Sequence, residues 1–115
     1  MVVVGHSQCG GVAACVNAAN RPPPPQLPGT PLVRWLTPLT DLARSLSIGS
    51  LPLKEAMSLL AEENVKRQVE NLSEMETIKG AWARGEDVQI HGMIYDLSTG
   101  HLTDLGVTQP VGAKE

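Results

Sequence analysis

Aromatic residues are almost absent from this sequence of 115 residues, which has two tryptophans, one tyrosine and no phenylalanine. Apolar residues still make up 42% of the chain, which is an ordinary fraction for a globular protein. The core must therefore be aliphatic, built from Val, Leu, Ile, Ala and Met. At this length one compact domain should bury roughly two-thirds of the surface of the unfolded chain.

Positive charge is also scarce, because nine Lys and Arg stand against twelve Asp and Glu, for a formal net charge of -3. The chain therefore offers no basic field for nucleic acid or an anionic membrane. No apolar run approaches the roughly 18 residues needed to span a bilayer, and nothing resembles a secretory signal. Two cysteines, Cys9 and Cys15, are too few for a disulfide framework. We expect a cytoplasmic protein with no nucleic-acid or membrane partner.

The three valines directly after Met1 predict a β-strand that ends near Gly5. A continuous β-branched run is typical of a strand buried on both faces, as in the middle of a parallel sheet. Such a strand needs a neighbour on each side. We therefore expect upstream strands to be missing on the N-terminal side, or to be supplied by another chain. A glycine-rich loop follows, and Val12–Ala19 predicts a helix that stops at Asn20.

The middle of the chain predicts helices that follow a proline-rich loop. Arg21–Pro31 holds six prolines and predicts an extended surface insertion. Helical spacing returns over Leu32–Leu46, with Pro38 as a kink or restart, and Leu53–Leu72 predicts the longest helix. A further helix should begin with a capping box formed by Ser73 and Glu76, and should stop at Gly85.

The end of the chain predicts a β-hairpin, formed by Val88–Leu97, a tight turn and His101–Leu105. The resulting order, β-α-loop-α-α-α-β-β, predicts an α/β fold. We expect a central, mostly parallel sheet with flanking helices, truncated at the N-terminal side and closed by the C-terminal hairpin. Residues 1–106 would form one partial domain that contains the insertion 21–31, and residues 107–115 a flexible tail.

The most informative pattern is the loop that follows the first strand, Gly5–Gly11 (GHSQCGG). Sites in open α/β sheets lie at the carboxyl ends of strands. An imidazole from His6 and a thiolate from Cys9 are both standard zinc ligands. Gly10 and Gly11 would let the backbone approach a metal, and the helix N-terminus would favour an anion beside it. On spacing alone the alternative stays open that the pair is accidental and that Cys9 is merely a small residue at the start of a helix.

Four segments together resemble the β-class carbonic anhydrases. The first is Val2–Gly11 (VVVGHSQCGG), which is similar to that family's second zinc-binding motif. In the family's order there follow Trp35–Leu39 (WLTPL), Glu63–Leu72 (ENVKRQVENL) and the closing hairpin His91–Leu102 (HGMIYDLSTGHL). Several separate motifs in the same order and spacing make a chance similarity improbable.

The resemblance implies reversible hydration of carbon dioxide to bicarbonate, with zinc-bound hydroxide as the nucleophile. His6 and Cys9 match two of the three protein ligands of a Cys₂His zinc site, and Gly10 and Gly11 match the turn that lines the substrate site. The resemblance also implies a homodimer or higher oligomer. His91 lies in a strand motif, where we expect a structural role.

The sequence departs from the family's pattern in one major respect, because it contains no Cys-x-Asp-(Ser/Thr)-Arg string. In the family that motif supplies the third zinc ligand and an Asp–Arg pair that orients the hydroxide, and it would lie upstream of Met1. The activity of this chain alone is therefore doubtful, and a catalytically incompetent subunit with a structural or partner role is the alternative. Carbonyl sulfide and carbon disulfide remain alternative substrates, since near relatives of this fold hydrolyse them.

The remaining noticeable residues have simpler interpretations. We expect Cys15 to be a core thiol and not a replacement ligand, and His101 to face solvent. Trp35 and Trp82 should anchor a core or an interface. The run Pro22–Pro25 could be a polyproline ligand, but a loop insertion is the preferred interpretation.

Overall fold

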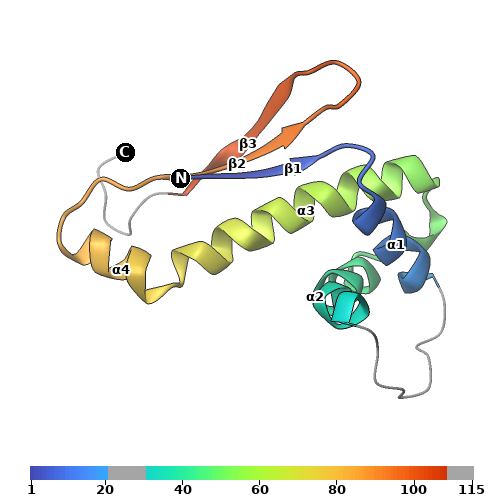
Figure 1. Cartoon of the computed structure of the whole chain (residues 1–115), viewed down its shortest axis with the longest axis horizontal. Helices are drawn as coiled ribbons and strands as arrows, with labels where there is room; N and C mark the ends of the chain where they lie inside the picture. Colours follow the sequence, from blue (N-terminus) through green and yellow to red (C-terminus); the bar gives the residue numbers. More distant parts are fainter. Residues whose placement is uncertain (21–30, 109–115) are drawn as a thin grey trace. The chain divides into compact units, whose positions relative to one another are not determined.

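The computed structural model describes residues 1–20 and 31–108 of the chain (Figure 1). These residues form two compact units, one of Met1–His6 with the chain from Glu62 onward, the other of Ser7–Ala61. Helix α3, Leu53–Ser73, contributes residues to both units. None of the helices in the described ranges is long and apolar enough to cross a membrane.

The first unit contains a three-stranded mixed sheet with the order β1-β2-β3. Strand β1 (Val2–His6) runs parallel to β2 (Ile90–Tyr95), and β2 runs antiparallel to β3 (Leu102–Thr108). A bulge at Gly92 and Met93 interrupts the register of β2 with β3. The α/β class and the closing hairpin are therefore as predicted, and the parallel pairing joins the two ends of the chain.

Strand β1 differs from its prediction, because only one of its faces is buried. Val2 and Val4 are 56% and 52% exposed, whereas Val3 packs against the core. The reason is that successive side chains point to opposite faces of a strand, and the core of this unit lies on the face that carries Val3. The prediction of a strand buried on both faces is wrong for the described chain.

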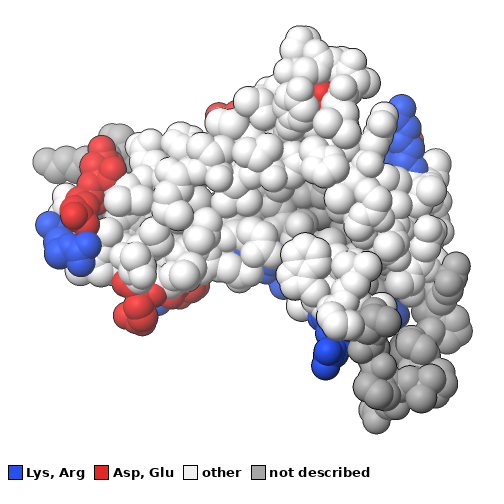
Figure 2. Space-filling view, in the orientation of Figure 1, with Lys and Arg blue, Asp and Glu red and all other residues white. Residues whose placement is uncertain are grey.

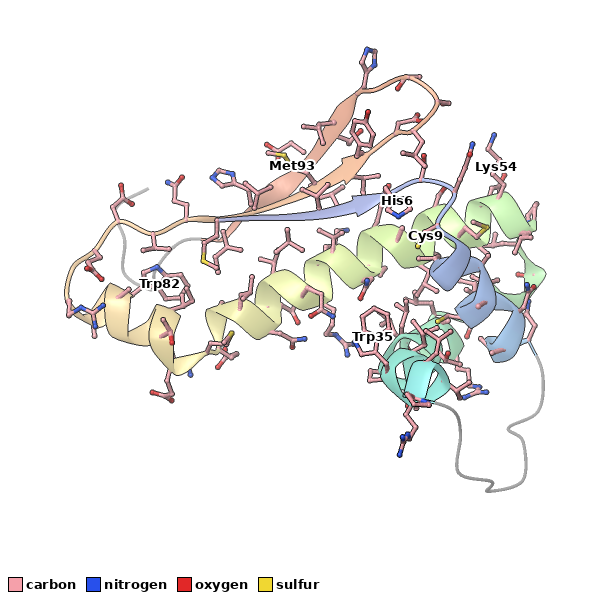
Figure 3. All side chains as sticks on the ribbon, in the orientation of Figure 1. His6, Cys9, Trp35, Lys54, Trp82 and Met93 are labelled. Atoms are coloured by element: carbon pink, nitrogen blue, oxygen red, sulfur yellow. The ribbon has the colours of Figure 1, made fainter. Side chains whose placement is uncertain are left out.

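The core of the first unit lies between the sheet and the second half of α3, with α4 (Glu76–Ala83) at one end (Figure 1). Trp82 lies on α4 (Figure 3), packs against this core as predicted, and donates a hydrogen bond from its Nε1 to the carbonyl oxygen of Val88 at 2.8 Å. Aliphatic side chains supply the rest of the core, in agreement with the composition: Val3, Val65, Val69, Leu72, Ile78, Val88, Ile90, Ile94 and Leu105.

The boundaries of the helices and of β3 confirm one sequence prediction and contradict two. Gly85 has a φ of +79°, so it stops α4 in the left-handed conformation that the sequence predicted. The predicted capping box is wrong, because Ser73 is the last residue of α3 and its hydroxyl donates to the carbonyl oxygen of Glu70 at 2.6 Å. The tail predicted from residue 107 also starts too early, since Thr108 still pairs with Ile90 in the sheet.

The second unit is helical, with α1 (Gly10–Ala19) packed against α2 (Pro31–Ser45). A short 3₁₀ helix, Ile48–Ser50, leads into the first half of α3. Helix α2 continues through Pro38, so the proline neither stops nor restarts it. Pro31 is the first residue of α2, a position where the missing N–H is tolerated.

Trp35 is 77% exposed, so it is not a core residue. The insertion predicted at 21–31 falls outside the described residues, except for Pro31, and so does most of the predicted tail.

Candidate metal centre

His6 is the last residue of β1. The β-branched valines before it fix the extended backbone, and parallel pairing with β2 places His6 opposite Tyr95 in the register. The imidazole therefore belongs to the carboxyl end of a parallel strand, where ligand sites of α/β sheets are usually found. His6 is exposed.

Cys9 occupies the N-cap of α1, with an extended backbone at φ -75° and ψ 122°. Its carbonyl oxygen accepts the first hydrogen bond of the helix, from the backbone N–H of Ala13 at 3.0 Å. The thiol is free and half-buried. Gln8, the residue before it, has a φ of +55°, which reverses the chain between strand and helix. This local geometry places the candidate ligand Cys9 at the start of α1.

Gly10 and Gly11 form the first turn of α1, where backbone N–H groups lack partners within the helix. A Cβ atom added at Gly10 would meet no atom within 4 Å, and one added at Gly11 would come no closer than 3.8 Å, to the Sγ atom of Cys9. The packing of the second unit therefore does not require glycine at either position. Open space at a helix N-terminus suits the approach of an anion.

His6 and Cys9 are candidate zinc ligands, but the described residues do not complete a ligand set around them. His6 is the last residue of the first unit, and Cys9 lies in the second, with Ser7 and Gln8 between them in the chain. Within residues 1–20 and 31–108, no group of three or more His, Cys, Asp or Glu side chains could hold a metal ion. Catalytic zinc usually has three protein ligands. The residues present thus fit part of such a site.

The cysteine and histidines not proposed as ligands lie where a structural or solvent-facing role predicts. Cys15 is 1% exposed in the second unit, and its Sγ lies 3.8 Å from the carbonyl oxygen of Leu36, as expected of a core thiol. His101 is exposed, as predicted. The backbone N–H of His91 donates to the carbonyl oxygen of Met1 at 2.9 Å, which joins β2 to the start of the chain.

Tyr95 is the residue near the candidate site that the sequence did not indicate. Its pairing with His6 depends on the register of two strands that lie 89 positions apart in the chain. Periodicity predicts each strand separately but not which residues face one another. Only an assumed alignment of the Val2–Val4 strand against the His91–Tyr95 strand could have suggested it.

These features define a class of protein: an α/β chain in which a parallel strand ends at His6 and the following helix has Cys9 at its N-cap. The sequence profile of the family described as "Carbonic anhydrase" matches residues 1–102. This chain belongs to the carbonic anhydrase family.

Relatives place the chain in the β class. It is 35% identical to the protein named "Beta carbonic anhydrase 6, mitochondrial" from Arabidopsis thaliana over 101 residues. This match covers 85% of this chain and 33% of that relative. It is 27% identical over 117 residues to the Saccharomyces cerevisiae protein named "Carbonic anhydrase", covering 99% of this chain and 52% of that relative.

Solved structures agree with this fold. The β-carbonic anhydrase of Coccomyxa, solved in complex with acetazolamide, aligns with a TM-score of 0.78 and 23% identity, over 96% of this chain and 49% of that one. This likeness supports the α/β architecture. The chain spans about half the length of the Saccharomyces cerevisiae and Coccomyxa proteins and a third of the length of the Arabidopsis thaliana protein.

Proposed function

We propose that this chain takes part in the reversible hydration of carbon dioxide to bicarbonate, with His6 and Cys9 as two ligands of a Zn²⁺ ion. One observation carries the proposal: in a chain whose carbonic anhydrase match covers residues 1–102, a His at the end of β1 and a Cys at the N-cap of α1 flank the strand-to-helix junction. Carbonyl sulfide and carbon disulfide are competing substrates to be assayed beside carbon dioxide.

Each part of the junction has a distinct task under this proposal. Neutral imidazole and thiolate are the donor forms that bind zinc, and a bound zinc ion supplies a Lewis acid that makes water reactive near neutral pH. The backbone N–H groups of Gly10 and Gly11 lie at the N-terminus of α1, which is the positive end of the helix dipole. They would orient an anion such as bicarbonate.

The incomplete donor set limits what the chain does alone. Cys9 and Cys15 are the two cysteines of the sequence, and Cys15 is buried in the second unit. A second thiolate would therefore have to come from outside this sequence. Two protein ligands hold zinc weakly, and no Asp–Arg pair in a Cys-x-Asp-x-Arg string is present to orient a bound water. We expect weak zinc binding and slow hydration by the isolated chain.

The ligand assignment is tested by cobalt substitution, because Co²⁺ occupies zinc sites and a thiolate ligand gives it a charge-transfer absorption. We expect this band for the unmodified chain, its loss in Cys9→Ser, and weakened metal binding in His6→Ala. His101→Ala is the matched control for the histidine change, since His101 is also exposed but lies in the hairpin turn. Equal affinity in His6→Ala and His101→Ala would refute the assignment of His6.

Activity is tested separately by stopped-flow hydration of carbon dioxide, with zinc content measured on the same sample. We expect low zinc occupancy and slow turnover for the chain alone, and a gain when a separate polypeptide carrying the Cys-x-Asp-x-Arg motif is added. Stoichiometric zinc with rapid turnover by the chain alone would contradict the need for a third donor. No gain from the added motif would contradict the proposed role in catalysis.

A further inference from the structure

We propose that Gln8 is a positioning residue for the candidate metal centre, because its left-handed backbone holds Cys9 at the N-cap of α1. The ligand role of Cys9 in this proposal rests on the proposed function. Gln8 has a φ of +55°, in a region that residues other than Gly, Asn, Asp and His seldom adopt. Such strained residues persist only where the surrounding structure imposes the conformation, and they cluster at functional sites.

The strain at Gln8 is notable because glycine would adopt a positive φ at little steric cost. The stretch Gly5–Gly11 contains three glycines. Within the described residues 1–20, however, none of these glycines has a positive φ, whereas Gln8 does. The strain in this loop therefore falls on the residue directly before Cys9.

Cys9 departs from a second local preference. Ser, Thr, Asp and Asn are favoured at a helix N-cap, because their side-chain oxygens accept hydrogen bonds from the first turn. Cys9 occupies the N-cap without a side-chain capping hydrogen bond, and only its carbonyl oxygen bonds to the helix, by accepting from the N–H of Ala13 at 3.0 Å. The thiol is not used to cap α1. Two adjacent residues that local preferences disfavour are expected where a site takes precedence over stability.

Charge does not account for the position of Cys9 at the start of α1 (Figure 3). Residues 1–20 contain no Lys, Arg, Asp or Glu, and the surface over β1 is uncoloured in Figure 2, so no ion pair within this stretch fixes the loop. The side chain of Gln8 is exposed. The backbone of Gln8 is thus the feature that turns the chain directly before Cys9.

Three variants separate the backbone of Gln8 from its side chain. Gln8→Gly and Gln8→Asn both tolerate a positive φ, although glycine has no side chain. Gln8→Val strongly disfavours a positive φ, because valine is β-branched. All three variants retain His6 and Cys9. A difference in metal affinity among them therefore reports on the position of a ligand and not on its loss.

Cobalt titration measures this affinity through the thiolate charge-transfer band. We expect Gln8→Gly and Gln8→Asn to bind Co²⁺ within about threefold of the unmodified chain, and Gln8→Val to bind it about tenfold more weakly. Ser47→Val is the matched control. Ser47 also has a positive φ, +53°, in the second unit, but it lies at the N-cap of the 3₁₀ helix, so cobalt affinity should not change.

Hydrogen exchange of the Ala13 N–H gives a second measurement that needs no metal, because this group donates to the carbonyl oxygen of Cys9. NMR should show exchange about tenfold faster in Gln8→Val. Exchange of Ala13 should be unchanged in Gln8→Gly, Gln8→Asn and Ser47→Val. Circular dichroism checks the fold of each variant.

The two measurements separate the positioning role of Gln8 from the ligand role of Cys9. Absence of the cobalt band in the unmodified chain would refute the ligand role, and exchange of Ala13 would then decide the positioning role alone. Unchanged exchange or unchanged cobalt affinity in Gln8→Val would overturn the positioning role. Gln8→Gly is decisive even if Gln8→Val folds poorly, because faster exchange or weaker cobalt binding in Gln8→Gly would assign the effect to the side chain.

Discussion

Replacing Gly92 by alanine perturbs the closest approach between the sheet and α3. A Cβ atom at this position would lie 3.0 Å from the Cγ1 of Val65 and 3.3 Å from the Cγ2 of Val69. Both valines are buried, and a valine in a helix strongly prefers one χ1 rotamer, so neither can turn aside freely. The strand and helix would have to move apart by a few tenths of an ångström.

The size of the effect follows from known cases of overpacking, which destabilise proteins by about 1 to 3 kcal/mol. Gly80→Ala is the matched control. It lies inside α4, where a new Cβ would meet only the flexible end of Arg84 at 3.4 Å. Because alanine favours helix over glycine by up to about 1 kcal/mol, this variant should be as stable as the parent or more so.

Urea denaturation followed by tryptophan fluorescence measures both variants. Trp82 reports on the first unit, so the experiment uses a Trp35→Phe background to remove the exposed tryptophan of the second unit. We expect a lower midpoint for Gly92→Ala and an equal or higher one for Gly80→Ala. Equal stability of Gly92→Ala and its parent would refute the contact.

A double-mutant cycle identifies the partner. Val65→Ala alone should destabilise the unit by leaving a cavity, but combined with Gly92→Ala it should make room for the added methyl group. We expect the double variant to be more stable than the sum of the single effects by at least about 0.5 kcal/mol. Strict additivity would show that the two residues do not touch.

Three further changes test other contacts. Trp82→Phe removes the donor to the carbonyl oxygen of Val88 and should destabilise the first unit by about 1 to 2 kcal/mol, measured by urea denaturation. Gly10→Ala meets no atom within 4 Å, so its melting temperature should not fall. A hydrogen bond from Lys79 to Glu74, with their charge attraction, raises the pKa of Lys79 above 10.5, and NMR titration of Glu74→Gln should show a lower pKa. The stabilisation that the Lys79–Glu74 ion pair contributes is present below pH 10.5 and is lost as the pH rises through the raised pKa of Lys79.

Much of the fold could be predicted from local pattern. The helix predicted at Leu53–Leu72 is α3, which ends one residue later, and Gly85 stops α4 because its positive φ suits glycine. Val88, Ile90 and Ile94 lie within the segment predicted as the first strand of the hairpin, and all three pack against the core.

Features that depend on distant pairing could not be predicted in the same way. Val2 and Val4 are exposed because the core packs against the opposite face of the sheet, and a hydrophobic run does not reveal which face is covered. Ser73 has the spacing of a capping box, yet α3 continues to include it, and its hydroxyl bonds backward to Glu70. The pairing of His6 with Tyr95 likewise required the register of the sheet.

The contact at Gly92 also relates two of the sequence motifs to each other. The segments Glu63–Leu72 and His91–Leu102 resemble the family separately, but in space they meet, because Val65 and Val69 lie against Gly92. Their joint presence therefore reflects one helix-on-strand contact that holds the first unit together. Such a contact requires neither zinc nor the third ligand. The residues of this contact include neither His6 nor Cys9, so we expect the Gly92 variants to change the stability of the first unit without changing the affinity of the chain for metal.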